Sequence, residues 1–415
     1  MRIIAFEIRK NILRKPVIIP MILLLLINVF VVLYQSSHVQ DIFSDEVDIN
    51  QLTEKGYVYY QELHKEFDGN ITKEKQKELI SLHNNLEEIV NEGSYTKEYT
   101  SEAKTGYIFG DYSLVHKGFY TPMEYMVSYY SINNDMVEKA NDNILFYEKT
   151  NNKYEIDKNK YIVNNYKNRC ISDFYDVSGW KNLFSYNFSD VLLIIALMLL
   201  TLPMFYQERI NGMEKIVKGT IKGCKTYTFG KICSVVIGIS VFTVLLMLCN
   251  YIVFNCVYGL CDGNMPIYAL DCYKYTPFNI TLNEAYLAIT GMKLVAMIVI
   301  SIIFTFIAYI SKNPIITFIG FVGVVCLGLY CSGYIYCEDI FKSLLAIISP
   351  FSLLKFSDII KEFNEINLLG HFDLKILCCI KIQVIFGIVM FCFVSGMSKI
   401  RKHKIESTGE NYVTK

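Results

Sequence analysis

The sequence predicts an all-α polytopic membrane protein with six transmembrane helices, both termini in the cytoplasm and a large helix-rich extracellular domain. Three observations support this prediction. First, 53% of the 415 residues are hydrophobic and fall in long blocks, and runs of about 18 or more apolar residues are typical of membrane spans. Second, residues 36–188 carry 25 acidic and 16 basic residues, although the chain has zero formal net charge. Third, residues 207–231, between two apolar blocks, carry six basic and two acidic residues, and basic loops stay cytoplasmic.

Residues 1–15 are too short to span a membrane and predict an amphipathic helix lying at the cytoplasmic interface. Its expected apolar face holds Ile4, Ala5, Ile8 and Ile12, and its expected charged face holds Glu7, Lys10 and Arg14. A signal peptide is the alternative. The apolar run that follows is too long for one, and no small-residue cleavage site follows it. Residues 16–35 are therefore expected to form the first transmembrane helix.

Residues 36–188 contain no spanning run and are expected to form the extracellular domain. Helical spacing of apolar residues predicts helices over 73–90 and 122–147. Seventeen of the 31 tyrosines lie in this domain. Tyrosine combines an apolar ring with a polar tip, so these residues form either the core and rim of a small helical domain or a dedicated binding surface.

Residues 189–398 are expected to hold the other five spans, at 191–206, 232–258, 286–310, 315–334 and 374–396. The second of the six spans is short at 191–206, and we expect it to begin about one turn earlier, near Tyr186. An apolar segment at 340–354 is short and contains Lys342 and Ser349-Pro350. If it crossed the membrane, the basic tail at 399–415 would lie outside, against the positive-inside bias. We therefore expect it to be an outer re-entrant segment buried against protein.

No motif indicates catalysis, a metal or a directly bound cofactor. The stretch KGTIKGCKT at 218–226 resembles a phosphate-binding loop, but its glycine spacing is too short and Cys224 stands where that loop needs lysine. No paired carboxylates or His/Cys cluster has catalytic spacing, and the chain is expected not to be an enzyme. The thirteen cysteines lie mostly in apolar runs and include no C-x-x-C. Cys261 and Cys272 share an outer loop and are either bonded or free.

Ionisable residues inside spans indicate function by default. Lys293 and Lys381 each lie about two helical turns from the outer end of a predicted span. Snorkelling to the headgroups is the interpretation we favour, and a substrate pathway is the alternative. Four amide side chains within the spans are candidates for hydrogen bonds between helices: Asn28, Asn250, Asn255 and Gln383.

The basic loop has a layout that resembles a known family. Glu208 lies just past the second span, Gly212 follows four residues later, and Lys231 opens the third span. The chain resembles membrane permease subunits of the ABC-2 type, found in bacterial bacteriocin, antibiotic-peptide and multidrug exporters, in which this loop typically reads E-x-x-x-G before a basic residue. The six spans, the amphipathic start and the segment around Ser349-Pro350 fit that family. The usual turn sequence of the loop is absent, since residues 222–225 read KGCK.

The resemblance implies a multi-pass protein of a bacterial cell membrane that binds no ATP itself. A dimer of a cytosolic ABC ATPase would dock on the coupling loop 207–231, at Glu208, Gly212 and Lys231, and on the amino-terminal helix. A second permease subunit, identical or homologous, and membrane lipid would be the other partners. The acidic outer domain favours a cationic cargo, such as an antimicrobial peptide, and a lipophilic compound is also considered.

Two alternatives remain. The chain is either an ion or drug exporter of the same family with a structural outer domain, or a membrane sensor or scaffold. In the second case the outer domain would bind a ligand and the basic loop would recruit a signalling protein. A nucleic-acid partner is not expected, because a nucleic-acid binder concentrates positive charge in a soluble domain.

Overall fold

The computed structural model describes residues 2–37, 54–91, 103–213, 223–260, 262–311, 313–368 and 370–409. It is mostly helical, with two small antiparallel two-stranded sheets, of which only the second is a hairpin. Within the described residues, six helical segments are long and apolar enough to cross a membrane, as the sequence predicts. They are Lys15–Gln35, Ser178–Ile210, Thr228–Tyr258, Leu282–Ile310, Pro314–Tyr336 and Lys375–Phe393.

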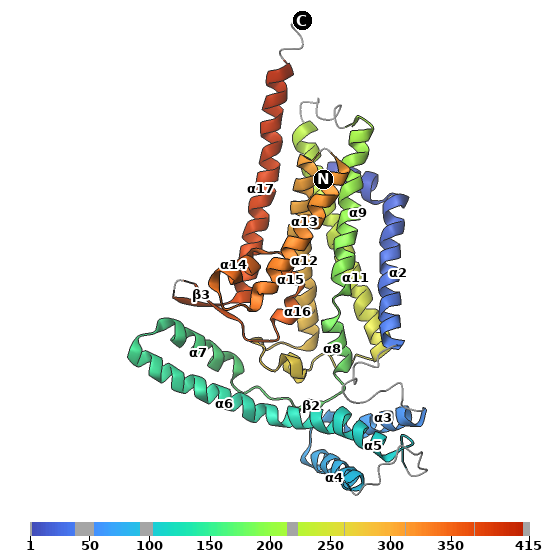
Figure 1. Ribbon diagram of the computed structural model, residues 1–415, viewed down its shortest axis with the longest axis vertical. Coiled ribbons are helices and arrows are strands. Elements are labelled where there is room, and N and C mark those ends of the chain that lie inside the picture. The colour runs from blue at the N-terminus through green and yellow to red at the C-terminus, as the bar shows by residue number, and fades with distance from the viewer. Residues whose placement is uncertain are drawn as a thin grey trace.

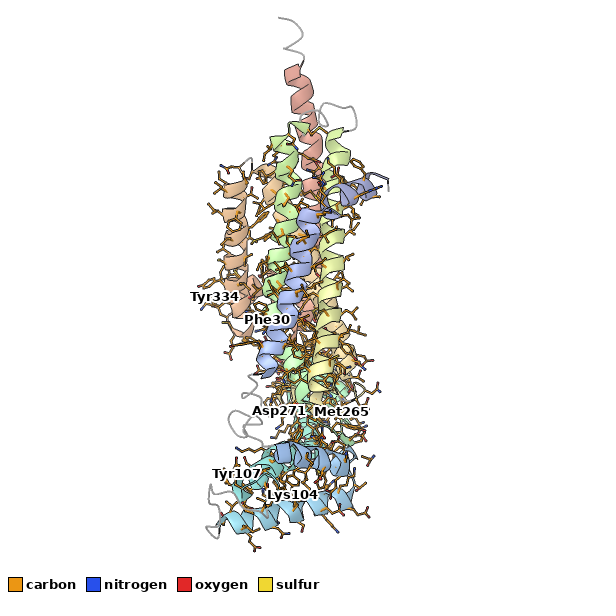
Figure 2. All side chains as sticks on the ribbon, turned by 90° about the vertical axis from the view of Figure 1, so that its right-hand side faces the viewer. Phe30, Lys104, Tyr107, Met265, Asp271 and Tyr334 are labelled. Carbon is orange, nitrogen blue, oxygen red and sulfur yellow. The ribbon has the colours of Figure 1, made fainter. Side chains whose placement is uncertain are left out.

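These segments form an upright bundle, and the region between the first and second spans lies across one end of it (Figure 1). We call that region the insert and define it as the described residues from 54 to 176. The opposite end carries α1 and the connection between α9 and α11, and we call it the loop end. Figure 2 shows the same arrangement after a quarter turn, with Phe30 in the bundle, Tyr107 in the insert and Asp271 between them.

The bundle consists of α2 (Lys15–Ser37), α9 (Phe188–Ile210), α11 (Gly223–Tyr258), α12 (Leu282–Ile310), α13 (Pro314–Ser332) and α17 (Lys375–Gly409). Among the spans, α12 and α9 are the most buried, and α13 and α2 are the least buried. Apolar side chains of α2 and α13 are exposed over much of their surface. In a membrane, such surfaces contact lipid or another polypeptide.

Polar side chains join several of these helices. The Asn28 side chain on α2 donates to Asn250 Oδ1 on α11 at 2.6 Å, and the Tyr186 hydroxyl donates to Asn28 Oδ1 at 3.0 Å. Gln383 on α17 donates to the Ile347 carbonyl at 3.0 Å. The expected inter-helix role is therefore confirmed for Asn28, Asn250 and Gln383, whereas Asn255 is exposed.

The amino terminus forms α1 (Arg2–Glu7) and one π-helical turn, η1 (Ile8–Ile12), which lie crosswise at the loop end (Figure 2). Glu7, expected on the charged face of an interfacial helix, is buried instead. Glu7 is 5% exposed, whereas Phe6 is 62% and Leu13 is 60% exposed. Glu7 lies near Glu208 of α9 and Lys231 of α11, and a buried carboxylate needs a basic partner such as Lys231. Arg14 of the same expected face is exposed.

The segment at 340–354 breaks into short helices at the insert end of the bundle, where α14 (Ile340–Ile348), α15 (Phe351–Leu354) and α16 (Phe356–Ile359) follow one another (Figure 1). None is long enough to cross a membrane. The Phe351 ring packs on α13 at Gly328, where an added Cβ would lie 2.1 Å from a ring carbon. A β-hairpin of β3 (Glu365–Leu368) and β4 (His371–Leu374) then leads into α17.

The insert is built from helices that lie across the bundle axis. Its elements are α3 (Glu54–Phe67), β1 (Gly69–Asn70), α4 (Lys73–Ile89), α5 (Ile108–Val115), η4 (His116–Tyr120), α6 (Thr121–Thr150), α7 (Lys153–Tyr166) and β2 (Asp173–Phe174), and α8 (Ser178–Ser185) connects it to α9. The predicted helices over 73–90 and 122–147 correspond to α4 and α6. Asn151, with φ at 52°, ends α6 and lets α7 return alongside it.

Candidate functional site

A buried charged cluster at the loop end contains two of the three residues that the sequence singles out in the loop. We call it the Glu208 cluster and define it as Glu7, Lys10, Asn11, Glu208 and Lys231. Lys231 Nζ lies 2.8 Å from Glu208 Oε2, and Lys10 forms an ion pair with the other oxygen of the same carboxylate. Lys231 is fully buried and Glu208 is 5% exposed. One carboxylate therefore joins the π turn η1, the end of α9 and the start of α11.

Glu7 brings a second carboxyl group to the cluster. The Asn11 side chain donates to Glu7 Oε2 at 2.6 Å. Burial raises the pKa of Glu7 above its ordinary value, and the nearby Glu208 carboxylate raises it further. Lys231, Lys10 and Asn11 act in the opposite direction. The sequence analysis missed this role of Glu7 and Lys10, because their partners lie about 200 residues away along the chain.

Gly212, the third of these residues, ends a helix. Its φ is +70°, and its N–H donates to the Arg209 carbonyl at 3.2 Å. This left-handed conformation at a helix carboxyl end favours glycine. An added Cβ would meet nothing within 4 Å, so the constraint at Gly212 is the backbone and not a crowded contact.

The loop is shorter than the predicted 207–231, because α9 continues to Ile210 and α11 begins at Gly223. Two apolar side chains are exposed where α9 ends: Ile210 is 81% and Met213 is 45% exposed. The middle of the loop, with Lys215, Lys218 and Lys222, lies outside the described residues. Arg209 instead turns back onto α12, where its Nη2 donates to the Tyr309 carbonyl at 3.2 Å.

The two intramembrane lysines have different surroundings. Lys381 is exposed and pairs with Asp373 near the end of its span, which agrees with snorkelling. The snorkelling interpretation of Lys293 is wrong, because Lys293 is 3% exposed and forms an ion pair with Asp190. The expected start of the second span near Tyr186 takes in this aspartate, and α9 begins at Phe188 and carries it inward.

The insert meets the bundle along a row of aromatic and basic side chains, which we call the tyrosine seam and define as Tyr125, Tyr129, Tyr161, Tyr166 and Arg169. The four tyrosine hydroxyls donate to backbone carbonyls of the α11–α12 connection, at Tyr268 (2.8 Å), Lys274 (3.3 Å), Pro277 (3.4 Å) and Tyr275 (2.8 Å). Burial raises the pKa of Tyr166 above its ordinary value, so its hydroxyl remains a donor. These tyrosines serve as contacts between the insert and the bundle.

Arg169 fixes the centre of the seam. It is 2% exposed, and its Nη1 donates to the Thr276 carbonyl at 2.9 Å. Its guanidinium carbon lies 4.1 Å from the ring centre of Tyr166 and 5.1 Å from that of Tyr268. Stacking of a guanidinium on aromatic rings is favourable, so this arginine holds α7 to the α11–α12 connection.

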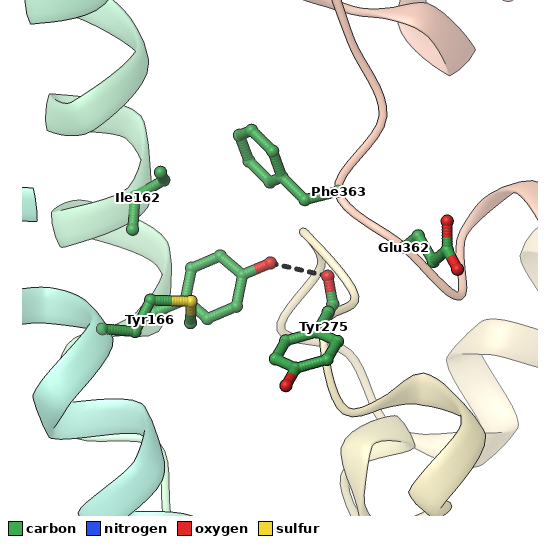
Figure 3. A pocket seen from close by; sticks show the side chains of 6 residues that line it. Ile162, Tyr166, Tyr275, Glu362 and Phe363 are labelled. Carbon is green, nitrogen blue, oxygen red and sulfur yellow. Dashed lines mark hydrogen bonds between the residues drawn. The ribbon is translucent and has the colours of Figure 1, made fainter. Parts of the chain in front are cut away.

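A pocket opens beside the seam, with a volume of about 300 Å³. Its lining residues come from the insert and from two connections of the bundle: Met136, Ile162, Tyr166, Tyr275, Glu362 and Phe363. Figure 3 shows that the dashed bond from the Tyr166 hydroxyl to the Tyr275 carbonyl crosses from the insert to the bundle. The lining is almost wholly apolar, and Glu362 is its one charged member.

The cysteine question stays open. Cys272 is a free thiol whose pKa is raised by burial, and Cys261 lies outside the described residues. Across the described ranges, no group of three or more His, Cys, Asp or Glu side chains is placed to hold a metal ion. Comparison with known proteins gives no match among protein-family models or curated proteins.

Proposed function

We propose that this chain is the membrane-spanning permease subunit of an ATP-driven exporter of the ABC-2 type. The observation that supports the proposal best is the Glu208 cluster, which ties a crosswise amino-terminal helix to both flanks of the basic loop. In this proposal the loop end is cytoplasmic and the insert is extracellular, in keeping with the positive-inside bias. The cell membrane of a bacterium is the proposed location.

The loop end offers a surface that suits a cytosolic protein. Ile210 and Met213 are exposed apolar residues next to a loop rich in lysine. Apolar residues ringed by polar ones are typical of protein interfaces. We propose that an ABC ATPase dimer binds here and hydrolyses ATP, while the chain itself holds no nucleotide.

The Glu208 cluster would transmit the movement of the ATPase. A force on the loop would reach α9 through Glu208, α11 through Lys231 and the crosswise helix through Lys10, because one set of ion pairs joins the half-buried Lys10 to the buried Glu208 and Lys231. A second permease subunit would cover part of the exposed surface of α2 or α13. Rocking of the two subunits would move an amphipathic peptide or a lipophilic compound outward.

The test is purification of the chain together with any ATPase encoded beside its gene. We expect a stable complex whose ATPase activity in nanodiscs exceeds that of the ATPase alone. Recovery of the chain without any nucleotide-binding subunit would reject the transporter proposal.

A second candidate, a membrane sensor, is favoured by the tyrosine seam, because a ligand on the insert would act directly on the α11–α12 connection. A sensor would recruit a signalling protein at the loop end and stimulate no ATPase. The same purification therefore separates the two candidates, since the co-purifying protein is either an ATPase or a signalling protein.

A further inference from the structure

We infer that the pocket beside the tyrosine seam binds an apolar side chain of a cationic amphipathic peptide, with a basic residue of that peptide over Glu362. The inference rests on the proposed function for the source of the peptide, which would be the cargo. It deepens that proposal by naming the place where the insert and the bundle would receive the peptide together.

The size and the walls of the pocket select an apolar group. A volume of about 300 Å³ is at the lower end of ligand pockets, so it holds one large side chain and not a folded peptide. Three of the six lining residues are aromatic: Tyr166, Tyr275 and Phe363. Burying an aromatic or aliphatic side chain against them is favourable, whereas a polar group would lose its water without replacement.

The walls are held in place before any ligand arrives. The Tyr166 hydroxyl bonds the Tyr275 carbonyl at 2.8 Å, and Arg169 stacks on the Tyr166 ring. Phe363 stacks with Phe372 of β4, with ring centres 6.1 Å apart. A preformed pocket loses little entropy when it binds a ligand. Because its walls come from both parts of the molecule, an occupant touches the insert and the bundle at once.

Charge determines which residue of the peptide would lie next to the apolar side chain in the pocket. Glu362 is exposed, and no ion pair joins it to another described residue. Its neighbour Lys361 is engaged with Asp358 at 2.7 Å, and Lys158 is engaged with Glu365. The Glu362 carboxylate, which points away from Tyr166 and Phe363 at the rim of the pocket (Figure 3), is therefore available for a basic group. The net acidic charge of residues 36–188 attracts such a peptide from a distance.

One basic residue near the pocket would repel a cationic ligand, so its removal provides a test of the ligand's charge. Lys274 Nζ lies 5.3 Å from the ring centre of Tyr275, so it borders the same wall. A cationic ligand is weakened by loss of Glu362 and strengthened by loss of Lys274. An anionic ligand would respond in the opposite sense to both changes.

The experiment uses the full chain in nanodiscs and the soluble tripeptide acetyl-Lys-Phe-Lys-amide, with binding followed by saturation-transfer NMR. We expect Glu362→Gln to weaken binding about 2- to 5-fold and Lys274→Gln to tighten it about 2-fold, since exposed ion pairs contribute about 0.2–1 kcal/mol. Phe363→Ala should weaken binding about tenfold. Glu148→Gln removes an exposed carboxylate at the far end of α6 and should change nothing.

Two control peptides define the ligand. Acetyl-Glu-Phe-Glu-amide lacks the cation and acetyl-Lys-Ser-Lys-amide lacks the anchor, so both should bind at least fivefold more weakly. A photoreactive benzophenone analogue of the central phenylalanine should cross-link to segments 136–166 or 362–363. Peptide binding that does not depend on Glu362 and Phe363 would overturn the inference, and so would cross-linking only to other segments.

The outcome separates the inference from the function on which it rests. If the ATPase co-purifies but Glu362→Gln and Phe363→Ala leave peptide binding unchanged, the pocket inference fails and the transporter proposal stands. If peptide binding depends on both residues but no ATPase is recovered, the transporter proposal fails and the pocket stands as a peptide site of a sensor.

Discussion

Lys231 Nζ lies 2.8 Å from Glu208 Oε2 across a fully buried contact between α9 and α11. The pair closes the base of the basic loop, and Lys10 of η1 reaches the same carboxylate. The sequence places Glu208 in a loop where a partner would touch it. The structure turns it inward, so its contribution to coupling would pass through the helices it joins.

Removing one member of this pair should destabilise the protein strongly. Lys231→Met leaves the Glu208 carboxylate buried with one basic partner fewer, and breaking a buried pair costs about 3–5 kcal/mol. Glu208→Lys should be more damaging still, because it brings a third ammonium group to Lys10 and Lys231. Thermal unfolding in detergent checks both variants.

The double variant Glu208→Leu/Lys231→Met provides the control for that experiment. It removes both charges together, and apolar replacements of buried pairs are often tolerated. We expect it to recover much of the lost stability. A double variant as unstable as the sum of the two single variants would show that the two residues act independently.

Exposed apolar residues at the loop end should matter for the partner and not for the fold. Ile210→Asp and Met213→Asp alter side chains that are 81% and 45% exposed, so the free energy of unfolding should change by less than about 0.5 kcal/mol. Capture of the ATPase should fall by at least tenfold, because a charge would enter an apolar contact.

Leu145→Asp is the matched control, since Leu145 is 61% exposed on α6 in the insert. It should leave ATPase capture unchanged. Equal capture by all three variants would assign the docking surface to another part of the chain.

The Glu7 carboxyl gives a prediction for pH. Its pKa is raised by burial and by Glu208, so the folded state favours the protonated form and the ionised form costs stability at neutral pH. Glu7→Gln should therefore raise the unfolding temperature at pH 7.5. The advantage should shrink as the pH falls through the raised pKa of the native protein, because the native glutamate then becomes protonated and neutral.

Unfolding temperatures of the native protein and of Glu7→Gln, measured between pH 5 and 8, test whether the advantage of the variant shrinks toward acid pH. A difference that grows toward acid pH would mean that the Glu7 carboxylate is stabilised by its lysine neighbours. Arg9→Gln is a suitable control, because Arg9 is exposed on η1 and should give a difference that does not depend on pH.

Two glycines of α13 form a matched pair. A Cβ at Gly328 would lie 2.1 Å from a ring carbon of Phe351, whereas a Cβ at Gly323 would meet nothing within 4 Å. Gly328→Ala should cost about 1–3 kcal/mol, as overpacking does, and Gly323→Ala should be neutral or slightly stabilising. Thermal unfolding compares them directly. Equal effects would show that α15 does not pack against α13 as described.

The spans could be predicted closely because hydropathy over about 20 residues is a local signal. The insert was predicted only at α4 and α6. Helix α7 was missed because its apolar positions are filled by tyrosines such as Tyr154 and Tyr161, which blur the apolar pattern. In η1 a π turn alters the helical spacing, and Glu7 faces inward for partners on distant helices.

Site residues were predictable where a local rule applied. Gly212 follows from the need to end α9 with a left-handed residue. The Lys293–Asp190 pair could have been found from the expected start of the second span near Tyr186, since that start brings Asp190 into the span and an aspartate there needs a partner. The pocket could not be predicted, because Tyr166, Tyr275 and Phe363 lie in three separate segments of the chain.

The bond between Asn28 and Asn250 also has a consequence for how the protein is made. Its two residues are 222 positions apart, so α2 is synthesised long before α11. At about 5–20 residues per second, this interval is on the order of 10–40 s. Tyr186 is made first, 158 positions after Asn28. Until then the Asn28 amide has neither partner, and an unsatisfied polar group is costly in hydrocarbon. We therefore expect the first span to reach its final place only after the second and third spans have been made.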